Sequence, residues 1–229
     1  MLRPTIILNL KAYREAMDKG IYDILSVVDD IAAGYPRIHF VIAPNVLYLR
    51  EVAHMSKHSL VFAQHADPVP YGAWTGHIPI RSLRLVGVDG FIVNHSERKV
   101  GLEFIKSAVN MAREENLRVC VCGGDLKEIE QVSRIKPTYV AFEPPELIGT
   151  GKSVSKMRPE DLKKSVRIIE ERSEGRTIPL CGAGISTKED VALAIKYGAL
   201  GILVASAFVK AKDRASVLEG FAEAIEENI

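Results

Sequence analysis

The sequence is short of cysteine and of net charge, and each shortage excludes a class of protein. Its 229 residues include three cysteines, Cys120, Cys122 and Cys181, and 30 basic side chains stand against 29 acidic ones. Three cysteines cannot all pair, and Cys120-x-Cys122 lacks the spacing of a zinc knuckle, so we expect free, buried thiols in a reducing cytoplasm. A net charge of +1 without long runs of one sign argues against nucleic acid and anionic membranes as partners.

Long hydrophobic runs are also missing. The first apolar run, Thr5–Asn9, is far shorter than the roughly 20 residues that span a bilayer, and nothing ahead of it resembles a signal peptide. With 47% hydrophobic and 26% charged residues, the chain has the composition of a globular protein with a sizeable core. We therefore expect a cytoplasmic protein that binds no membrane.

The sequence does contain a regular alternation of short apolar runs with longer amphipathic stretches. The runs predict eight strands, at Thr5–Asn9, His39–Ala43, Leu60–Gln64, Gly90–Asn94, Arg118–Cys122, Thr138–Glu143, Ile178–Gly182 and Gly201–Ala205. The stretches predict helices at about 14–33, 45–57, 79–87, 98–116, 125–134, 159–173, 187–197 and 213–227. Eight such repeats without a break predict a single domain, 1–229, in the form of a closed (β/α)8 barrel. An open, doubly wound sheet has the same periodicity and stays an alternative.

Three residues predict where helices begin. Asp125 and Thr187 precede amphipathic stretches and are suited to cap them, because their side-chain oxygens can accept hydrogen bonds from first-turn amides. Pro159 stands where its helix should make its first turn, which is the favoured helical position of proline.

The carboxyl ends of the predicted strands are polar, whereas the amino ends carry only turn residues. The polar ends are Asn9-Leu10-Lys11, Gln64-His65, Asn94-His95-Ser96-Glu97-Arg98, Glu143, Cys181-Gly182-Ala183-Gly184-Ile185-Ser186 and Ala205-Ser206. In a barrel these ends meet on one face, which is where the active sites of barrel enzymes lie. The asymmetry therefore predicts an active site.

Two of these residues suggest acid–base and charge chemistry. We expect His95 to lie at the start of a helix beginning near Ser96, whose partial positive charge favours a neutral imidazole that can donate to a developing oxyanion. Lys11 is a point charge that can meet an anion. A core histidine and a surface lysine are the alternatives. The other histidines form no metal-binding pattern, since His54 and His58 have no acidic residue between them, and we predict no metal site.

Glu143 ends a buried run and opens a loop of unequal stiffness. Pro144 and Pro145 stiffen its exit, and Gly149-Thr150-Gly151 loosens its far side. Pro144 also biases Glu143 toward extended backbone. The stretch predicts a catalytic base beneath a mobile lid at 144–151, and a surface glutamate ahead of a proline-rich connector is the alternative.

Glycine-rich and small-residue turns follow the last two predicted strands. Gly182-Ala183-Gly184 and Ala205-Ser206 occupy the places where barrels bind phosphate. Two nucleotide motifs fail on spacing: Glu146 stands where a P-loop ending at Gly151-Lys152-Ser153 needs glycine, and Thr187 stands where a dinucleotide motif needs glycine or alanine. We therefore predict no nucleotide cofactor.

Taken together, these residues resemble the triosephosphate isomerase family over nearly the whole chain. Five motifs match in order: Asn9-x-Lys11, Gly72-Ala73-Trp74-Thr75-Gly76, Asn94-His95-Ser96-Glu97-Arg98, Glu143-Pro144 and Ile148-Gly149-Thr150-Gly151. Each is weak alone, whereas five in order beside eight predicted strands are a strong signal. The stretches that begin at Glu143 and Cys181 look like the archaeal, short-chain branch of the family.

The resemblance implies interconversion of dihydroxyacetone phosphate and D-glyceraldehyde 3-phosphate through an enediol(ate), in glycolysis and gluconeogenesis, without a cofactor. It implies that Glu143 moves the proton between C1 and C2, that neutral His95 polarises the carbonyl and that Lys11 balances negative charge, an acid–base arrangement for which this family is a standard example. The lid would exclude water and so prevent the enediol from losing its phosphate.

The resemblance assigns supporting roles as well. Asn9 helps to hold the site, and Ser96 and Glu97 support it from behind, with Glu97 orienting Lys11. The phosphate is bound by backbone amides near Ile148, Gly184, Ala205 and Ser206.

Self-association is also implied. Thr75 lies on a predicted intersubunit loop, 71–77, that reaches the site of a neighbouring subunit, so at least a dimer is expected, and the archaeal branch commonly forms homotetramers. Cys181 and Gly184 replace the tyrosine and serine whose hydroxyls help to latch the lid in many members. Ala205-Ser206 stands where many members have two glycines. We expect the closing contacts of the lid to differ accordingly.

Two other functions compete with this one. Another phosphate-binding barrel enzyme, such as a lyase or synthase, would lack the joint set of Lys11, His95 and Glu143. A non-catalytic barrel that acts as a binding module would have lost at least one of them. The chain keeps all three.

Overall fold

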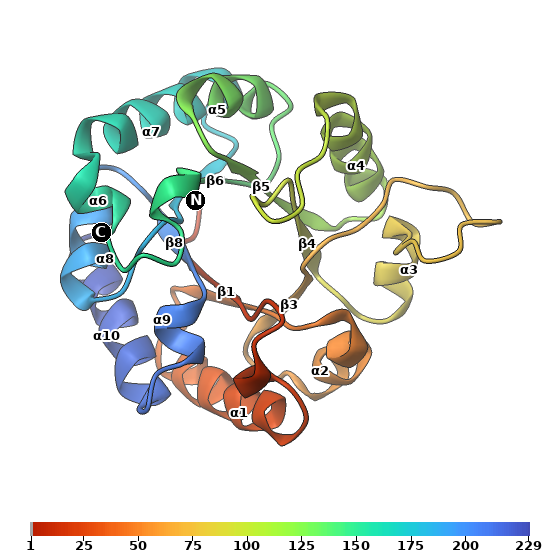
Figure 1. Ribbon diagram of the computed structural model, residues 1–229, viewed down its shortest axis with the longest axis horizontal. Coiled ribbons are helices and arrows are strands. Elements are labelled where there is room, and N and C mark those ends of the chain that lie inside the picture. The colour runs from red at the N-terminus through yellow and green to blue at the C-terminus, as the bar shows by residue number, and fades with distance from the viewer. Residues whose placement is uncertain (1) are drawn as a thin grey trace.

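A closed barrel of eight parallel strands lies inside a ring of helices in the computed structural model, which describes residues 2–229 (Figure 1). The strands are β1 Thr5–Asn9, β2 His39–Ala43, β3 Leu60–Ala63, β4 Gly90–Val93, β5 Arg118–Gly123, β6 Tyr139–Phe142, β7 Ile178–Cys181 and β8 Gly201–Val204. Each strand pairs with the next, and β8 pairs with β1. The predicted barrel is confirmed, and closure rules out the open sheet.

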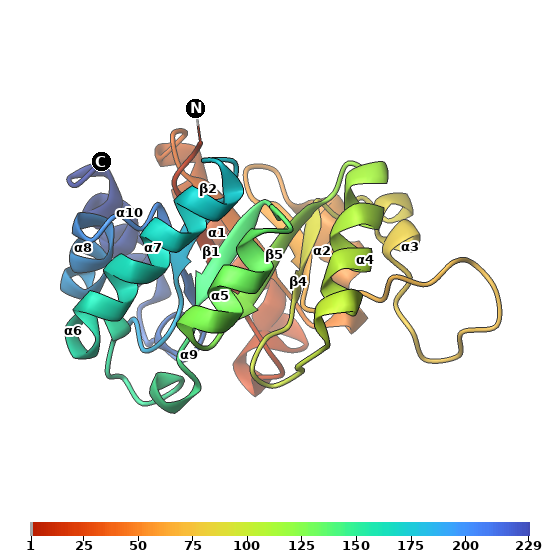
Figure 2. The ribbon, with the colours of Figure 1, turned by 90° about the horizontal axis from the view of Figure 1, so that it is seen from above.

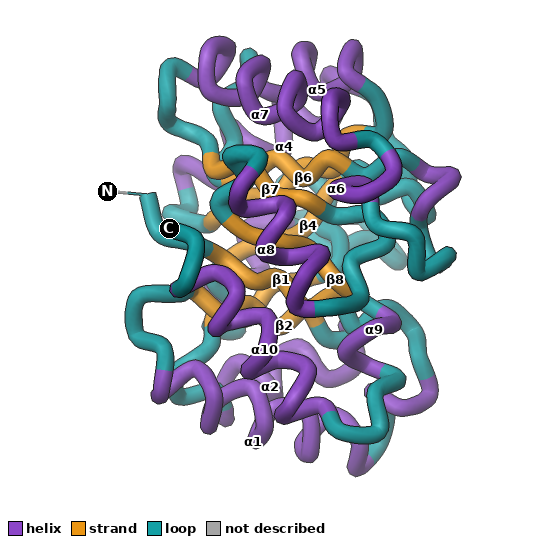
Figure 3. Tube along the Cα trace, turned by 90° about the vertical axis from the view of Figure 1, so that its left-hand side faces the viewer, coloured by secondary structure: helices purple, strands orange, loops and turns teal. Residues whose placement is uncertain are grey.

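Helices cover the outside of this barrel, and in side view they lie above and below the strands (Figure 3). They are α1 Lys19–Gly34, α2 Leu49–Met55, α3 Ile80–Leu85, α4 Leu102–Glu114, α5 Leu126–Ser133, α6 Val154–Met157, α7 Pro159–Ser173, α8 Lys188–Lys196, α9 Ser206–Val209 and α10 Arg214–Glu226. Short 3-10 turns lie at Arg14–Ala16, Val46–Tyr48 and Pro145–Leu147. Within residues 2–229, no helix is both long enough and apolar enough to cross a membrane.

The helix starts predicted at Asp125, Pro159 and Thr187 are confirmed. Pro159 opens α7. The side chain of Asp125 accepts a hydrogen bond from the amide of Glu128 at 2.8 Å, and Thr187 forms a capping box with Asp190 at the start of α8. These caps satisfy amides that have no partner inside the helix.

Period-two alternation along the strands fills both sides of the barrel wall. In β1, Ile6 and Leu8 pack against the helices, while Ile7 points into the interior. The interior is closed by large side chains that include Phe62 and Tyr139, whose ring centroids lie 6.1 Å apart. Because the barrel is packed along its length, chemistry can take place only at an end.

The predicted helix at 98–116 is wrong at its start. Residues 95–98 form a turn closed by a hydrogen bond from the amide of Arg98 to the carbonyl of His95 at 2.8 Å, and α4 begins only at Leu102. The side chain of Asn94 accepts a hydrogen bond from the amide of Val100 at 3.1 Å, and this bond keeps residues 95–100 from joining the helix. His95 therefore does not lie at a helix N-terminus.

Two other predicted helices are each divided. The segment 14–33 contains a 3-10 turn and then α1, separated at Asp18, whose φ of 51° is incompatible with helix. The segment 45–57 divides into a 3-10 turn and α2. The helix α6 and the 3-10 turn at Pro145–Leu147 were not predicted. The remaining differences are shifts of a few residues at element ends.

The two ends of the barrel are clearly distinguished in side view (Figure 2). Both termini lie at one end, and α9 and the loop between β6 and α6 lie at the other. The segment 71–77, exposed throughout, projects sideways from the barrel. The functional residues of the sequence must therefore be sought at the end that carries α9.

Candidate active site

A cavity of about 290 Å³ opens at the carboxyl ends of the strands. It is lined by Lys11, Tyr13, His95, Glu143, Gly182 and the segments 148–151, 184–186 and 203–207. Seven of the predicted site residues are therefore brought together, namely Lys11, His95, Glu143, Ile148, Gly184, Ala205 and Ser206. Asn9, Ser96 and Glu97 lie outside the lining, and Thr75 lies on the exposed loop 71–77, away from this cavity of its own chain.

Lys11 is fixed by its neighbours through both backbone and side chain. Its φ of 48° is unusual for a residue other than glycine. The side chain of Asn9 accepts a hydrogen bond from the backbone amide of Lys11 at 3.1 Å. Gln64 donates to its carbonyl at 2.9 Å. The ammonium lies 2.7 Å from a carboxylate oxygen of Glu97. Asn9, Gln64 and Glu97 thus set the place of the positive charge without lining the cavity.

Asn94 anchors the turn that carries His95. Its φ is 62°, and its buried side-chain amide donates to the carbonyl of Cys122 at 2.8 Å and to Glu128 at 2.6 Å. Glu128 is fixed in turn by Lys99 at 2.6 Å and by the amide of Gly124 at 2.7 Å. Burial alone would raise the pKa of Glu128, but these donors outweigh it and hold the pKa below its usual range. An ionised carboxylate therefore holds the turn in place.

The tautomer of His95 follows from its hydrogen bond. The ring is 6% exposed, and the backbone amide of Glu97 donates to Nδ1 at 3.2 Å. The carboxylate of Glu97 is more distant, at 3.6 Å from the same nitrogen. A nitrogen that accepts a hydrogen bond carries no proton, so the proton of the neutral ring is on Nε2. A turn amide, and not a helix N-terminus, thus contacts Nδ1 of His95.

Glu143 extends from β6 into the cavity. Its amide donates to the carbonyl of Gly123 at 2.8 Å, which continues the strand pairing by one residue. Its side chain is 3% exposed and packs flat against Gly182, where a Cβ would lie 2.8 Å from the carboxyl carbon of Glu143. Glycine at 182 therefore makes room for the carboxylate.

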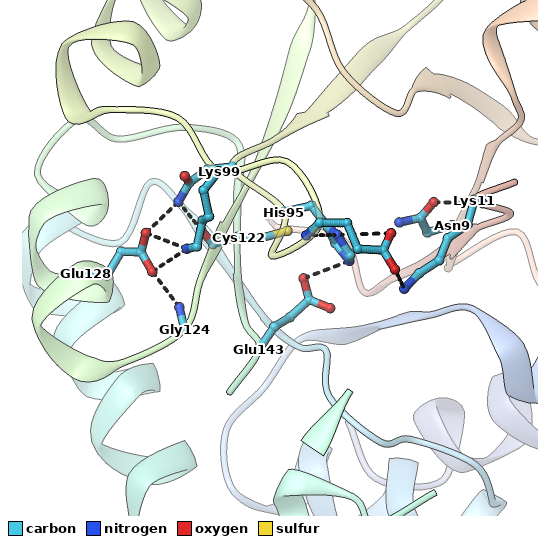
Figure 4. A network of polar contacts seen from close by, with 10 residues as sticks. Asn9, Lys11, His95, Lys99, Cys122, Gly124, Glu128 and Glu143 are labelled. Atoms are coloured by element: carbon cyan, nitrogen blue, oxygen red, sulfur yellow. Dashed lines mark hydrogen bonds and ion pairs between the residues drawn. The ribbon is translucent and has the colours of Figure 1, made fainter. Parts of the chain in front are cut away.

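One oxygen of this carboxylate has no hydrogen-bond partner. Oε2 of Glu143 is buried and unpartnered within the described chain, and it lies 3.9 Å from Nε2 of His95 (Figure 4). Leaving a buried polar atom unpaired costs about 1–3 kcal/mol. Such an oxygen is therefore ready to accept a proton from a group that enters between it and His95.

The three cysteines are free and buried, as predicted. A hydrogen bond with Cys120, burial and the nearby charge of Glu143 raise the pKa of the Cys122 thiol well above its usual range. Burial chiefly, with the charges of Asp190 and Glu143, raises the pKa of the Cys181 thiol as well. Cys122 and Cys181 are therefore protonated and act as packing groups.

Part of the cavity wall is built from backbone, at the start of α9 and at Gly184. The amides at the start of α9 have no partner inside the helix. Gly184 has a φ of 70°, and a Cβ there would overlap the carbonyl of Lys152, so only glycine lets Lys152 lie against this turn. Gly149 and Gly151 also have positive φ, at 74° and 71°.

Several lining residues were given no role from the sequence, and Tyr13 and Ser186 are the polar ones among them. Tyr13 follows β1 and lies beneath Lys210, whose ammonium is 4.5 Å from the ring centroid. No pattern in the sequence marks it, because its neighbour comes from the far end of the chain. Ser186 was visible at the polar end of β7 but was given no role, although its hydroxyl now proves to bind Asp190 at 3.1 Å.

Comparison with known proteins identifies the relatives of this chain. A family model described as triosephosphate isomerase matches residues 4–226. A triosephosphate isomerase of Caldivirga maquilingensis is 43% identical over 210 residues, which cover 92% of each chain. Those of Pyrobaculum islandicum and Thermoplasma volcanium are 40% and 39% identical, over 92% and 91% of this chain and 90% and 94% of theirs.

Proposed function

The chain belongs to the triosephosphate isomerase family and interconverts dihydroxyacetone phosphate and D-glyceraldehyde 3-phosphate, and from this premise we propose that Glu143 and His95 share the proton transfer. The similarity to archaeal members fits the short chain and the residues that begin at Glu143 and Cys181. Membership sets aside both alternatives, the phosphate-binding lyase or synthase and the non-catalytic barrel.

The observation that carries the proposal is the free Oε2 of Glu143 opposite Nε2 of His95. Glu143 removes a proton from C1 of dihydroxyacetone phosphate, and the electron pair of that bond forms the double bond between C1 and C2. The carbonyl oxygen becomes an enediolate oxygen, which accepts a hydrogen bond from the Nε2 proton of neutral His95. Glu143 then returns its proton to C2, while the hydroxyl proton passes from the oxygen on C1 to the oxygen on C2.

Lys11 supplies positive charge to the substrate. Its ammonium borders the cavity and is steered by Glu97 at 2.7 Å, so its position is set before any ligand arrives. Preorganised charge of this kind stabilises the enediolate and the phosphate without reorganisation during the reaction.

The phosphate binds to backbone amides near Ile148, Gly184, Ala205 and Ser206. The support for this assignment is that all four residues line one cavity with Glu143, and that the amides which open α9 have no intrahelical partner. Residues 144–151 act as a mobile lid over this phosphate and exclude water from the enediolate.

The protein acts as a homotetramer in the cytoplasm, with a dimer as the smaller possible unit. The exposed loop 71–77 supports self-association, because Trp74 on it is 42% exposed and a projecting apolar side chain is better covered by a partner. Thr75 on this loop then reaches the neighbouring subunit's site. Light scattering should give a molar mass about four times the 25.2 kDa of one chain, and a concentration-independent monomer would refute the assembly.

Isomerisation in D2O tests the proton shuttle. A proton held on Glu143 during the enediolate stage can exchange with solvent, so D-glyceraldehyde 3-phosphate formed from dihydroxyacetone phosphate should carry deuterium at C2, as measured by NMR. The Glu143→Gln variant should form almost no product. Product free of deuterium at C2, together with full turnover by Glu143→Gln, would instead indicate a direct hydride shift and would overturn the role of Glu143.

A further inference from the structure

The carboxylate of Asp190 accepts more hydrogen bonds than helix capping requires. Asp190 is 2% exposed in the first turn of α8, and its capping box needs only the bond from the amide of Thr187 at 3.0 Å. Its carboxylate also accepts from the hydroxyl of Ser153 at 2.9 Å and from the amide and hydroxyl of Ser186 at 3.0 and 3.1 Å, and it pairs with the ammonium of Lys156 at 2.7 Å. A group with this many partners serves more than one segment.

The two carboxylate oxygens face different parts of the chain. Oδ1 receives Ser153 and Lys156, which follow the lid at 144–151. Oδ2 receives Ser186 and Thr187, which belong to the turn after β7. Since Ser186 lines the cavity, Asp190 joins the end of the lid to the cavity wall.

Other contacts strengthen this junction. The amide of Val154 donates to the carbonyl of Ala183 at 3.0 Å, and the hydroxyl of Ser155 donates to the backbone carbonyl of Asp190 at 3.0 Å. Gly184 lies so close to the carbonyl of Lys152 that any side chain would overlap it. The segment 152–155 therefore packs on 183–184 as one unit.

The rest of the lid is held differently. Within the described chain, the amides of Ile148 and Thr150 bond only inside the lid, to Pro145 and Leu147 at 3.3 Å each. Glu146 pairs with Arg158 at 2.6 Å, but both side chains are half exposed, and exposed pairs contribute little. The turn at 181–184 also offers no side-chain hydroxyl to hold the lid. The side chain of Leu147 packs in the core, and the polar attachment is the one at Asp190.

We propose that Asp190 is a positioning residue that fastens the C-terminal end of the lid to the turn bearing Gly184 and Ser186. This inference rests on the proposed role of the lid. Burial alone would raise the pKa of Asp190, but Lys156, Ser186 and Ser153 outweigh it and keep the pKa low, so the anchor is a charged group. Its charge-assisted hydrogen bonds fix the position of the lid relative to the backbone amides that bind phosphate.

If the lid were no longer held in this position, the enediolate could react differently. When water reaches the enediolate, the bond between C3 and the phosphate oxygen can break. The proton on the C1 oxygen passes to the C2 oxygen, the C1 oxygen forms a carbonyl, the pair of the double bond between C1 and C2 moves to join C2 and C3, and phosphate leaves with the electron pair of its bond to C3. The enol of methylglyoxal remains. A poorly anchored lid should therefore increase phosphate release per isomerisation, a ratio that simple loss of stability does not alter.

The test compares Asp190→Asn with Asp29→Asn, measuring inorganic phosphate release, isomerisation and KM. Asp29 is a matched control, because it is also buried and its carboxylate accepts hydrogen bonds from the amides of Lys57, His58 and Ser59 at 2.8, 3.2 and 2.9 Å. These three residues lie just before β3, at the end of the barrel opposite the cavity. We expect Asp190→Asn to raise the ratio of phosphate release to isomerisation by roughly tenfold, up to the about 10²-fold that a misplacement of 1 Å can produce. KM should rise, and Asp29→Asn should leave both values unchanged.

The outcomes separate this inference from the function on which it rests. Equal ratios in the two variants and the wild type would overturn the anchor while leaving the isomerase intact. A wild-type protein without isomerisation would instead refute the function. If Asp190→Asn does not fold, Ser153→Ala removes only the lid-side hydroxyl and should raise the ratio in the same direction, and an unchanged ratio there would overturn the anchor as well.

Discussion

The ring of His95 is held by one hydrogen bond, and its surroundings serve orientation more than stability. Its Nδ1 accepts the amide of Glu97 at 3.2 Å, and its Nε2 points at the carboxylate of Glu143, 3.9 Å away. A histidine buried only for packing would have no need of an acidic neighbour across a cavity. The ring is therefore better explained by the reaction than by the core.

Replacing His95 by glutamine tests this explanation. The side-chain amide can keep the bond to the turn but is a weaker and differently placed donor, so kcat should fall by roughly 10²–10³-fold. The melting temperature should stay close to that of the wild type. A large drop in melting temperature with kcat retained would show that His95 is a structural residue.

Glu97 offers a second prediction at this scale. Its side chain is 59% exposed, and exposed ion pairs contribute only about 0–1 kcal/mol to stability. Glu97→Gln should therefore hardly change the free energy of unfolding, while kcat/KM falls because Lys11 is no longer steered. Glu130→Gln, which breaks surface pairs with Arg134 and Arg172 at 2.9 and 2.8 Å, is the control. Equal kcat/KM values in both variants would contradict the steering role.

At the scale of the elements, the sequence predicts strands better than the loops that follow them. Buried runs such as Thr5–Asn9 and His39–Ala43 match the observed strands because their pattern is local. The predicted start of α4 was wrong because the side chain of Asn94 accepts a hydrogen bond from the amide of Val100. Such a bond competes with helix formation, and helix propensities do not predict it. The anchor at Asp190 was invisible, since Ser153 and Asp190 meet only in the folded barrel.

The loop 71–77 is clamped at its base by Asp67. Its carboxylate accepts the amide of Ile78 at 2.7 Å and pairs with His65 at 3.1 Å, and its own amide donates back to the carbonyl of Ile78 at 2.7 Å. The two ends of the loop are thereby tied together.

Asp67→Ala should loosen this loop and weaken self-association. We expect the molar mass measured by light scattering to fall at protein concentrations where the wild type stays assembled. Asp89→Ala, which removes a bond of 2.8 Å to the amide of Val61 at the amino end of β3, is the control and should remain assembled. An undiminished mass for Asp67→Ala would contradict the clamp.

For the whole molecule, the buried ionisable groups predict a loss of stability in acid. Burial lowers the pKa of His65 and of His39 in the folded state. A histidine with a lowered pKa binds fewer protons in the folded protein than in the unfolded protein. The free energy of unfolding therefore rises with pH between the folded-state pKa and the unfolded-state pKa, and stability is lost as pH falls below about 6.5. Each histidine contributes at most about 1.4 kcal/mol per pH unit.

Carboxylates add a second stage at lower pH. Burial alone would raise the pKa of Asp67 and of Asp190, but the hydrogen bonds that they accept outweigh it and lower both. Stability from these groups is present above about pH 4 and is lost as pH falls through their folded values. Melting temperatures from pH 8 to pH 3 should therefore decline in two stages, and His39→Gln should reduce the first. A melting temperature that stays flat or rises from pH 7 to pH 5 would refute this account.

The central claim is that Glu143 is the base at the end of β6, and the turnover of Glu143→Gln tests it most directly. Glutamine keeps the shape and the fit against Gly182 but cannot take a proton, so kcat should fall by at least roughly 10²–10⁴-fold. Inorganic phosphate should still bind with its wild-type Kd. Glu146→Gln, three residues along and half exposed, should leave kcat within a few-fold of the wild type. A Glu143→Gln enzyme that turns over at the wild-type rate would contradict the claim.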